Sequence, residues 1–259
     1  MQKITIKKIL KKKNKLPIAC LTAYTKNIAK IADKYCDIIL VGDSLGMVLY
    51  GMKTTRDVKI ETMILHAKTV KSITKRSLVV FDMPYKTYTN KFSAYKNAKK
   101  VIKLTKCDAI KLEGGAKIAK IVEHLVKKGI PVLGHIGLLP QTSSNFKVIG
   151  KSSIERKRIL EDALTISNSG AFGIIIECVV ENLAKKITKN IPIPTIGIGA
   201  SKYCDGQILV TEDMVGLSDF FPKFVRQYAK LNKSIEKCVK KYVKDVKTKR
   251  FPFTKNVYK

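Results

Sequence analysis

The sequence predicts a single eight-unit (β/α)8 barrel of the TIM type, in which parallel strands alternate with helices around a closed sheet. The chain has 259 residues, close to the roughly 250 at which such a barrel closes. Short β-branched runs alternate with longer amphipathic segments, which is the pattern of βαβ units around a parallel sheet. Eight such runs can be counted, and no break in composition divides the chain. An open, doubly wound sheet is therefore the less favoured alternative.

The predicted elements follow one another in the order that a barrel requires. The candidate strands are 18–24, 37–42, 77–82, 108–113, 131–135, 172–177, 194–199 and 207–211. Helical patterns occupy 26–35, 61–75, 91–106, 117–128, 154–169 and 181–190, whereas the connection between the last two strands is short for a full helix. The remaining segments, all within one domain, are a basic lead-in at 1–17, further helices at 220–231 and 234–246 that would close or cap the barrel, and a polar tail at 247–259.

Composition indicates a globular protein of a reducing compartment. Hydrophobic residues make up 45% and charged residues 27% of the chain, which excludes a wholly disordered or fibrous protein. No apolar stretch approaches the roughly 20 residues of a membrane span, and the basic start MQKITIKKILKKKNK lacks the apolar run and cleavage site of a secretory signal. The six cysteines are scattered without paired or metal-ligand spacing, as expected of free thiols. We therefore expect a cytoplasmic protein.

The net charge makes a nucleic-acid partner the first alternative to consider. A total of 51 Lys and Arg residues against 20 Asp and Glu residues leaves a formal charge of +31, and such a balance is typical of proteins that bind nucleic acid. Few of these residues are arginine, however, although arginine is the preferred residue for bidentate contacts to bases and phosphates. The lysines are spread over nearly every segment, as an AT-rich genome would cause. We therefore expect small-molecule ligands, no dedicated nucleic-acid partner and no membrane.

Polar and ionisable side chains recur at the carboxyl ends of the predicted strands. In a barrel these ends converge on one face, which carries the active site. The residues in such positions are Asp43, Ser44, Asp82, Lys111, Glu113, His135 and Glu177. A random distribution would not favour strand ends, so we expect these side chains to form one site.

Asp43 and Asp82 end two strongly apolar runs, DIILVGD and SLVVFD. Carboxylates at the mouth of a parallel barrel repel each other unless a cation neutralises them, and ligand sets made only of oxygen suit Mg²⁺ better than Zn²⁺. Either aspartate could instead cap the helix or turn that follows it. As a pair, the two predict a site for a hard divalent cation.

Lys111 and Glu113 lie two positions apart in DAIKLEGG, so a strand directs both side chains to the same side. Two interpretations stay open for Lys111: an ion pair inside the barrel, or a contact with an anionic oxygen of a substrate. Gly114 and Gly115 would allow a close approach of the backbone at that rim of the barrel.

Glu177 and His135 are the candidates for proton transfer and hydrogen bonding. Glu177 closes the almost wholly apolar run AFGIIIECVV, so burial should raise its pKa and suit it to act as a general base near neutral pH. It could equally cap the helix that begins near Glu181. His135, in PVLGHIG, either donates a hydrogen bond to a substrate or satisfies a buried carbonyl group.

Eight runs of the sequence carry a resemblance that covers nearly the whole chain. They are LTAYT at 21–25, LVGDSLGMVLYG at 40–51, FDMPY at 81–85, IKLEGG at 110–115, GHIGLLPQ at 134–141, IECV at 176–179, IPTIGIGA at 193–200 and CDGQILV at 204–210. In this order they resemble the ketopantoate hydroxymethyltransferases. The resemblance implies a β/α-barrel enzyme that transfers a one-carbon unit from 5,10-methylenetetrahydrofolate to 3-methyl-2-oxobutanoate, forming 2-dehydropantoate for pantothenate synthesis.

The resemblance also implies roles for individual residues. Asp43 and Asp82 match the ligands of one Mg²⁺ per subunit, and Glu113 also belongs to that metal site. Glu177 matches the proton acceptor. The contacts to the keto acid match Asp43, Ser44, Asp82 and Lys111. Members of the family are cytoplasmic homodecamers, so a homo-oligomer is implied here too.

The implied reaction suits these residue types. Removing a proton from the carbon beside a ketone forms an enolate, which needs a Lewis acid on the carbonyl oxygen and a base at the carbon. The nearest alternative enzyme is a lyase related to isocitrate lyase or phosphoenolpyruvate mutase, although the KKCGH-like loop of the lyases is absent. A basic nucleic-acid-binding protein whose barrel has lost its activity is the alternative outside the enzymes.

Some positions depart from the family pattern. Thr25 stands where aspartate is usual, and Ser201 replaces a glycine. Residues 141–153 form a shorter connection that lacks a glycine pair, and the tail RFPFTKNVYK lacks a Glu-His ending. The expected metal and keto-acid residues are all retained.

Overall fold

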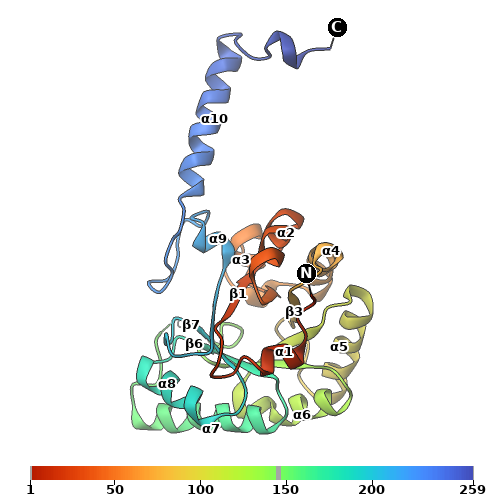
Figure 1. The fold of residues 1–259 in the computed structure, drawn as a ribbon, viewed down its shortest axis with the longest axis vertical. Coiled ribbons are helices and arrows are strands. Elements are labelled where there is room, and N and C mark those ends of the chain that lie inside the picture. The colour runs from red at the N-terminus through yellow and green to blue at the C-terminus, as the bar shows by residue number, and fades with distance from the viewer. Residues whose placement is uncertain (1, 144–146, 259) are drawn as a thin grey trace. The chain divides into compact units, whose positions relative to one another are not determined.

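Eight parallel strands form a closed barrel, as predicted (Figure 1). The structure, a computed structural model, describes residues 2–143 and 147–258. The strands are β1 (Ile18–Thr22), β2 (Ile38–Val41), β3 (Leu78–Asp82), β4 (Ala109–Glu113), β5 (Val132–Gly137), β6 (Gly173–Glu177), β7 (Thr195–Ile198) and β8 (Gly206–Leu209). Because β8 pairs with β1 in parallel, the sheet closes without an edge. All eight predicted strands are confirmed, and the open doubly wound sheet is excluded.

The long helices between the strands also confirm the predicted segments. They are α2 (Lys26–Tyr35), α4 (Ile60–Ile73), α5 (Lys91–Thr105), α6 (Ala119–Lys127), α7 (Ser153–Asn168) and α8 (Glu181–Asn190). Thr25 is the N-cap of α2, and its side chain accepts a hydrogen bond from the backbone N–H of Ile28. Threonine and aspartate are both good N-caps, so the departure at Thr25 leaves the start of this helix intact.

Several short helical elements escape prediction from the sequence. They are α1 (Ile6–Leu10) in the basic lead-in, α3 (Leu45–Tyr50) directly after β2, and the 3₁₀ turns η1 (Thr55–Asp57) and η2 (Gly115–Ile118). Each spans less than two helical turns, so its apolar residues cannot repeat often enough to show a helical period.

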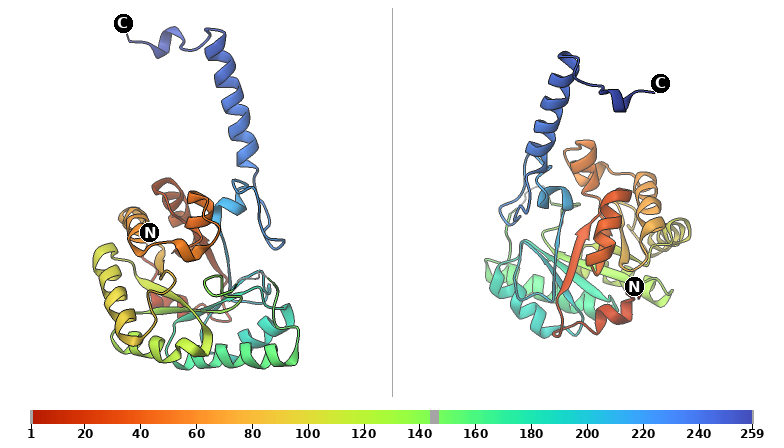
Figure 2. Two further views of the ribbon diagram at one scale, coloured as in Figure 1. Left: turned by 180° about the vertical axis from the view of Figure 1, so that it is seen from behind. Right: turned by 45° about the horizontal axis from the view of Figure 1, so that its top comes forward.

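The strands are covered to different extents. β2, β3 and β4 are buried at every position, because side chains fill the inside of the barrel. Helices lie outside the strands (Figure 2). β1 and β8 instead alternate between buried and exposed positions. Ala19 and Gln207, which are paired in the register, are both exposed. No helix joins β7 to β8, as predicted, and this part of the outer wall is left uncovered.

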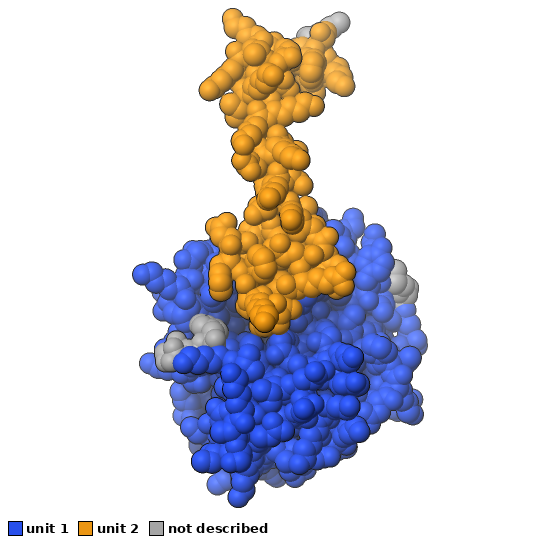
Figure 3. Space-filling model, turned by 90° about the vertical axis from the view of Figure 1, so that its left-hand side faces the viewer, with its two compact units in different colours: residues 1–210 blue, residues 211–259 orange. Residues whose placement is uncertain are grey.

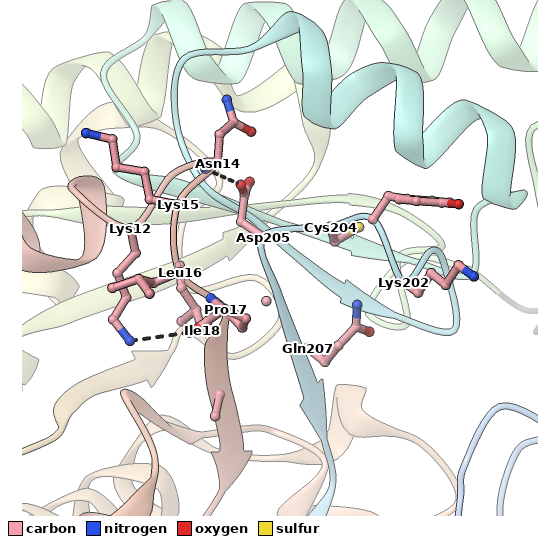
Figure 4. A pocket seen from close by; sticks show the side chains of 13 residues that line it. Lys12, Asn14, Lys15, Leu16, Pro17, Ile18, Lys202, Cys204, Asp205 and Gln207 are labelled. Carbon is pink, nitrogen blue, oxygen red and sulfur yellow. Dashed lines mark hydrogen bonds between the residues drawn. The ribbon is translucent and has the colours of Figure 1, made fainter.

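Hydrogen bonds to Asp205 tie together the amino-terminal ends of several strands. Its carboxylate accepts from Nζ of Lys13 (2.9 Å) and from the backbone N–H of Thr195 (2.8 Å). The same carboxylate accepts from the backbone N–H of Asn14 (2.8 Å), as Figure 4 shows. A cavity of about 490 Å³ opens beside it, lined by residues 12, 14–19 and 202–207. This cavity lies at the starts of β1 and β8, away from the strand ends that carry the predicted site.

Asp33, near the end of α2, is expected to stabilise the connection that leads into β3. Its carboxylate accepts hydrogen bonds from the backbone N–H groups of Lys75 (2.9 Å), Arg76 (2.9 Å) and Ser77 (2.7 Å). Partial burial raises the pKa of Asp33, but these donors outweigh it and lower the pKa below its ordinary value. We expect Asp33→Ala to lower the free energy of unfolding by about 2 kcal/mol near neutral pH, as measured by urea denaturation.

The effect of Asp33→Ala should depend on pH. Because the pKa is lowered in the folded state, the contribution of the charge is fully present above the ordinary carboxyl pKa of about 4 and is lost as the pH falls through the lower folded value. The difference from the wild type should therefore shrink in acid. Glu161→Ala, which removes an exposed carboxylate of α7, is the control and should change stability by less than about 0.5 kcal/mol. A difference in stability between the wild type and Asp33→Ala that stays constant in acid would contradict the role assigned to the charge of Asp33.

The C-terminal residues form a second compact unit. The chain divides into residues 1–210 and 211–259 (Figure 3). The second unit contains α9 (Thr211–Met214), α10 (Leu231–Lys247) and the 3₁₀ turn η3 (Thr254–Asn256). α10 confirms the helix predicted at 234–246 and begins three residues earlier. The single-domain organisation and the capping of the barrel stay predictions.

The helix predicted at 220–231 is wrong. Residues 220–230 form turns and irregular backbone. Pro222 has no N–H to donate, and the N–H groups of Tyr228 and Leu231 donate to the carbonyls of Met214 and Val215. Hydrogen bonds to residues in and just after α9 thus replace the helical bonds that the apolar spacing suggested.

Two further expectations concern the membrane and the thiols. Among the described residues, no helix combines the length and the apolar character needed to cross a bilayer. All six cysteines are free, as predicted, and only Cys238 is exposed. Burial raises the pKa of the Cys36 and Cys107 thiols to about 11, so both stay protonated near neutral pH.

Candidate active site

The strand ends bring the predicted ionisable residues together. In the register, Asp82 of β3 is paired with Lys111 of β4, and Glu113 of β4 is paired with His135 of β5. Neighbouring strands lie about 4.8 Å apart, so side chains on the same side of the sheet come into contact. The neighbours at this face are Asp43, Asp82, Lys111, Glu113, His135 and Glu177.

Lys111 joins two buried carboxylates. Its Nζ lies 2.9 Å from each carboxylate oxygen of Asp82 and 3.3 Å from Oε1 of Glu113. Burial lowers the pKa of Lys111, but Asp82, Glu113 and Asp43 outweigh it and raise the pKa well above its ordinary value. Lys111 is therefore a cation at neutral pH, and the interior ion pair is present. Its contact with a substrate stays a prediction.

His135 continues the line of charges from Glu113 to Glu177. Its Nδ1 is 3.4 Å from Oε1 of Glu113, and its Nε2 is 3.3 Å from Oε2 of Glu177. Within the described chain neither ring nitrogen makes a well-formed hydrogen bond, so the attraction is mainly between charges, and the alternative bond to a buried carbonyl is not found. Burial and Lys111 lower the pKa of His135, but the two glutamates outweigh them and raise it to about 9. His135 therefore carries a positive charge at neutral pH.

The pKa of Glu113 is lowered, whereas those of Lys111 and His135 are raised. Burial raises the pKa of its carboxyl group, but Lys111 and His135 outweigh burial and lower the pKa to about 2. Glu113 is thus ionised at any physiological pH. Its negative charge holds the two cations of the site on either side of it.

Glu177 is the most accessible member of the line. Its side chain is 15% exposed, against 5% or less for those of Asp82, Lys111, Glu113 and His135. It lies beside a charged histidine rather than among apolar side chains alone. Val180, not Glu177, occupies the N-cap position of α8, so the capping alternative is not adopted.

Asp43 and Ser44 follow β2 and are both held by hydrogen bonds. Oδ2 of Asp43 accepts from Nε2 of Gln141 (2.8 Å), and the N–H of Asp43 donates to Oδ2 of Asp82 (3.3 Å). The hydroxyl groups of Ser44 and Tyr24 are 2.7 Å apart. Burial and repulsion from Asp82 raise the pKa of Asp43 well above its ordinary value. Ser44, not Asp43, is the N-cap residue of α3.

Gln141 and Tyr88 belong to the site but are not predicted as site residues. The N–H of Gln141 donates to Oε2 of Glu113 (3.1 Å), and the hydroxyl of Tyr88 donates to Oε1 of Gln141 (2.5 Å). Both residues lie in connections, where no periodicity locates a side chain. The available signal was that Gln141 ends the family-like run GHIGLLPQ. Residues 144–146 of the shorter connection lie outside the described residues.

The chemistry of the donors fits a divalent cation. Within the described ranges no three acidic, histidine or cysteine side chains stand in a metal-binding arrangement, and Lys111 is the group bound between Asp82 and Glu113. The site nevertheless contains more carboxylates than cationic side chains. The repulsion between Asp43 and Asp82 is of the kind that a bound cation removes. Their oxygens are the hard ligands that Mg²⁺ prefers.

Gly137 allows the end of β5 to lie against the backbone of Glu177. Its φ is +97°, and a Cβ at this position would collide with the carbonyl oxygen of Glu177. We expect Gly137→Ala to lower the free energy of unfolding by more than about 2 kcal/mol and to reduce activity, because Glu177 must move. Urea denaturation and initial rates measure the two effects.

Gly129→Ala is the matched control for Gly137→Ala. Gly129 also has a positive φ, +77°, but nothing lies within 4 Å of a Cβ built there. The backbone penalty alone, about 1 kcal/mol, is therefore expected, with activity unchanged. Equal losses of stability and activity in the two variants would show that the close approach to Glu177 has no special role.

Solved structures with the same fold agree with the barrel. A phosphonopyruvate hydrolase gives a TM-score of 0.64 at 10% sequence identity and covers 99% of this chain and 93% of its own. A 2,3-dimethylmalate lyase, a member of the PEP mutase/isocitrate lyase superfamily, gives 0.62 at 11% identity, with 97% and 87% covered. At such identities the likeness shows the fold alone.

Sequence comparisons identify the family. The family model of ketopantoate hydroxymethyltransferase matches residues 3–254. The 3-methyl-2-oxobutanoate hydroxymethyltransferase of Pelagibacter ubique is 52% identical over 97% of this chain and 99% of that protein. The enzyme of the same name from Bartonella tribocorum is 48% identical over 100% of this chain and 97% of its own. These matches decide against the lyase alternative, and the chain belongs to the ketopantoate hydroxymethyltransferase family of pantothenate biosynthesis.

Proposed function

We propose that this hydroxymethyltransferase takes its one-carbon unit from 5,10-methylenetetrahydrofolate and adds it to 3-methyl-2-oxobutanoate, forming 2-dehydropantoate with the help of Mg²⁺. The observation that carries the proposal is the continuous line of charged contacts from Asp82 to Glu177. One end of this line is a pair of aspartates suited to a cation, and the other end is a partly exposed carboxylate. Enolisation of an α-keto acid needs both.

Glu177 is the proposed proton acceptor. It would remove the proton from C3 of the keto acid, and the electron pair of the broken C–H bond would become that of the enolate. C3 would then form a bond to the methylene carbon of the donor. Water would supply the hydroxyl oxygen as the two C–N bonds of that carbon break. The two nitrogens of the departing tetrahydrofolate would take up one proton from this water and the proton that Glu177 had accepted. His135, positively charged and 3.3 Å from Glu177, would orient the carboxylate and contribute a hydrogen bond to the substrate.

Asp43 and Asp82 would hold the Mg²⁺ ion, which when bound supplies Lewis-acid polarisation of the keto oxygen. Glu113, also expected at the metal site, is already bound by Lys111. We therefore propose that it acts through its charge rather than as a direct ligand. Lys111 would offset the negative charge of the enolate, and Ser44 would contact the keto acid.

The proposal also covers the location, the assembly and the partners of the enzyme. The family resemblance supports a cytoplasmic homodecamer that acts on small molecules and has no dedicated nucleic-acid partner. Analytical ultracentrifugation of the purified protein tests the assembly, and a monomer at micromolar concentration would overturn that part. Binding to DNA of any sequence, together with no turnover, would favour the nucleic-acid alternative.

Hydrogen exchange in D₂O tests the chemistry separately from the donor. The enzyme is mixed with 3-methyl-2-oxobutanoate, with and without Mg²⁺ and without folate, and loss of the C3 hydrogen is followed by NMR. We expect exchange that depends on Mg²⁺, and conversion to 2-dehydropantoate once 5,10-methylenetetrahydrofolate is added. No exchange in the folded protein with Mg²⁺ would overturn the mechanism. Exchange without subsequent product would overturn only the choice of donor.

A further inference from the structure

Gln141 lies in the connection after β5, and both the nitrogen and the oxygen of its side-chain amide make hydrogen bonds. It is only 1% exposed. Its Nε2 donates to Oδ2 of Asp43 (2.8 Å) and to the carbonyl oxygen of Met83 (3.0 Å), and its Oε1 accepts from the hydroxyl of Tyr88 (2.5 Å). These partners follow β2 and β3. One buried amide therefore links the ends of two strands to the connection that follows a third.

The partners decide how the amide is oriented. The carbonyl oxygen of Met83 can only accept a hydrogen bond, so the nitrogen of the Gln141 amide must face it. The second N–H of the same nitrogen then points to Asp43, whose Oδ2 must accept. Oδ1 of Asp43 accepts no hydrogen bond from any residue in the ranges 2–143 and 147–258. The carboxylate is thus anchored through one oxygen, while the other accepts no hydrogen bond within these ranges.

The backbone of Gln141 is held independently of its side chain. Its N–H donates to Oε2 of Glu113 (3.1 Å), and its carbonyl oxygen accepts from Nε of Arg56 (2.9 Å). Arg56 also donates from Nη2 to the carbonyl oxygen of Ser143 (3.0 Å). On the side of the connection, these bonds use only backbone atoms. A change of the Gln141 side chain should therefore leave the backbone of the connection in place.

We propose that Gln141 is a positioning residue, which holds the Asp43 carboxylate so that Oδ1 is the oxygen offered to the cation. Asp82 lies close enough to repel Asp43, and without the amide nothing else in the described chain anchors Oδ2. Loss of a group that orients a metal ligand typically lowers metal affinity by about 10- to 100-fold. The inference rests on the proposed function, since it takes Asp43 to be a ligand.

Gln141→Leu tests the role, because leucine fills similar space without donating. We expect the Kd for Mg²⁺, measured by titration calorimetry, to rise by about 10- to 100-fold. The kcat at saturating Mg²⁺ should fall, while KM for the keto acid changes much less. Should Gln141→Leu not fold, Gln141→Met retains the unbranched shape of glutamine and serves in its place.

Two controls separate positioning from general destabilisation. Gln207→Leu is matched in chemistry, since Nε2 of Gln207 also donates to a backbone carbonyl, that of Ser201 (2.8 Å), on the exposed side of β8. Asp33→Ala is the control for destabilisation, because its expected loss of stability arises outside the site. Both should bind Mg²⁺ with a Kd within about twofold of the wild type.

The outcomes distinguish this inference from the proposed function. If the wild type binds Mg²⁺ and exchanges the C3 hydrogen, but Gln141→Leu binds Mg²⁺ equally well, the positioning role is overturned and the function stands. A loss of affinity that Asp33→Ala shares would overturn it too. If the wild type neither binds Mg²⁺ nor exchanges the C3 hydrogen, both proposals fail together.

Discussion

Lys111→Met is expected to lower the free energy of unfolding by about 3–5 kcal/mol, because it leaves Asp82 and Glu113 buried without their shared cation. Methionine preserves the apolar stem of lysine and removes only the ammonium group. The two carboxylates would then lose contacts of 2.9 and 3.3 Å to Nζ. Activity should fall below the detection limit of the exchange assay. Urea denaturation near neutral pH gives the stability.

Added Mg²⁺ should partly restore Lys111→Met. Without the ammonium group of Lys111, the carboxylates of Asp82 and Glu113 repel each other, and a divalent cation can neutralise this repulsion. Mg²⁺ should therefore raise the unfolding midpoint of the variant more than that of the wild type. Lys127→Met is the control, because Lys127 also pairs with a glutamate, Glu123, but on the exposed face of α6. Its loss should stay below about 0.5 kcal/mol. Similar losses in the two variants would mean that the buried ion pairs do not support the barrel as proposed.

Glu177→Gln is expected to slow exchange of the C3 hydrogen of 3-methyl-2-oxobutanoate by about 10²- to 10⁴-fold. The amide has the shape of the carboxylate but cannot accept the proton at neutral pH. Because it can still lie 3.3 Å from Nε2 of His135, binding of Mg²⁺ and of the keto acid should change little. NMR in D₂O measures the exchange, and calorimetry measures the binding.

The control for Glu177→Gln is the same substitution four residues later. Glu181 lies in the first turn of α8 and is exposed, so Glu181→Gln should exchange at the wild-type rate. Unchanged exchange in Glu177→Gln would assign the proton acceptor to another residue. Loss of both exchange and Mg²⁺ binding would instead show that the charge of Glu177 supports the site as a whole.

The sequence predicts the strands of the barrel and the positions of the site residues, but not the contacts between those residues. Runs such as IILV and LVVF are apolar at every position, which is typical of parallel strands buried on both faces, and the structure contains all eight predicted strands. The strand-end rule then located Asp43, Asp82 and Glu177 without any knowledge of contacts. It could not show that Asp82 is opposite Lys111, because the register depends on how the strands shift against one another.

The errors also have physical causes. The segment 220–231 has helical apolar spacing, yet its backbone donors bond to residues in and after α9. α1 and α3 are too short to show a period. The sequence does not predict Gln141 as a site residue, because sequence patterns give the side chain of a residue in a connection no preferred direction, although Gln141 bonds to both Asp43 and Glu113.

The sequence by itself determined the barrel, the family and the face that carries the site, because these depend on local patterns and on the order of motifs along the chain. Only the tertiary structure decided which charges meet. Lys111 lies between Asp82 and Glu113, and His135 lies between Glu113 and Glu177. Gln141 reaches Asp43 across 98 positions of sequence. Such contacts arise when the barrel closes, and no local pattern records them.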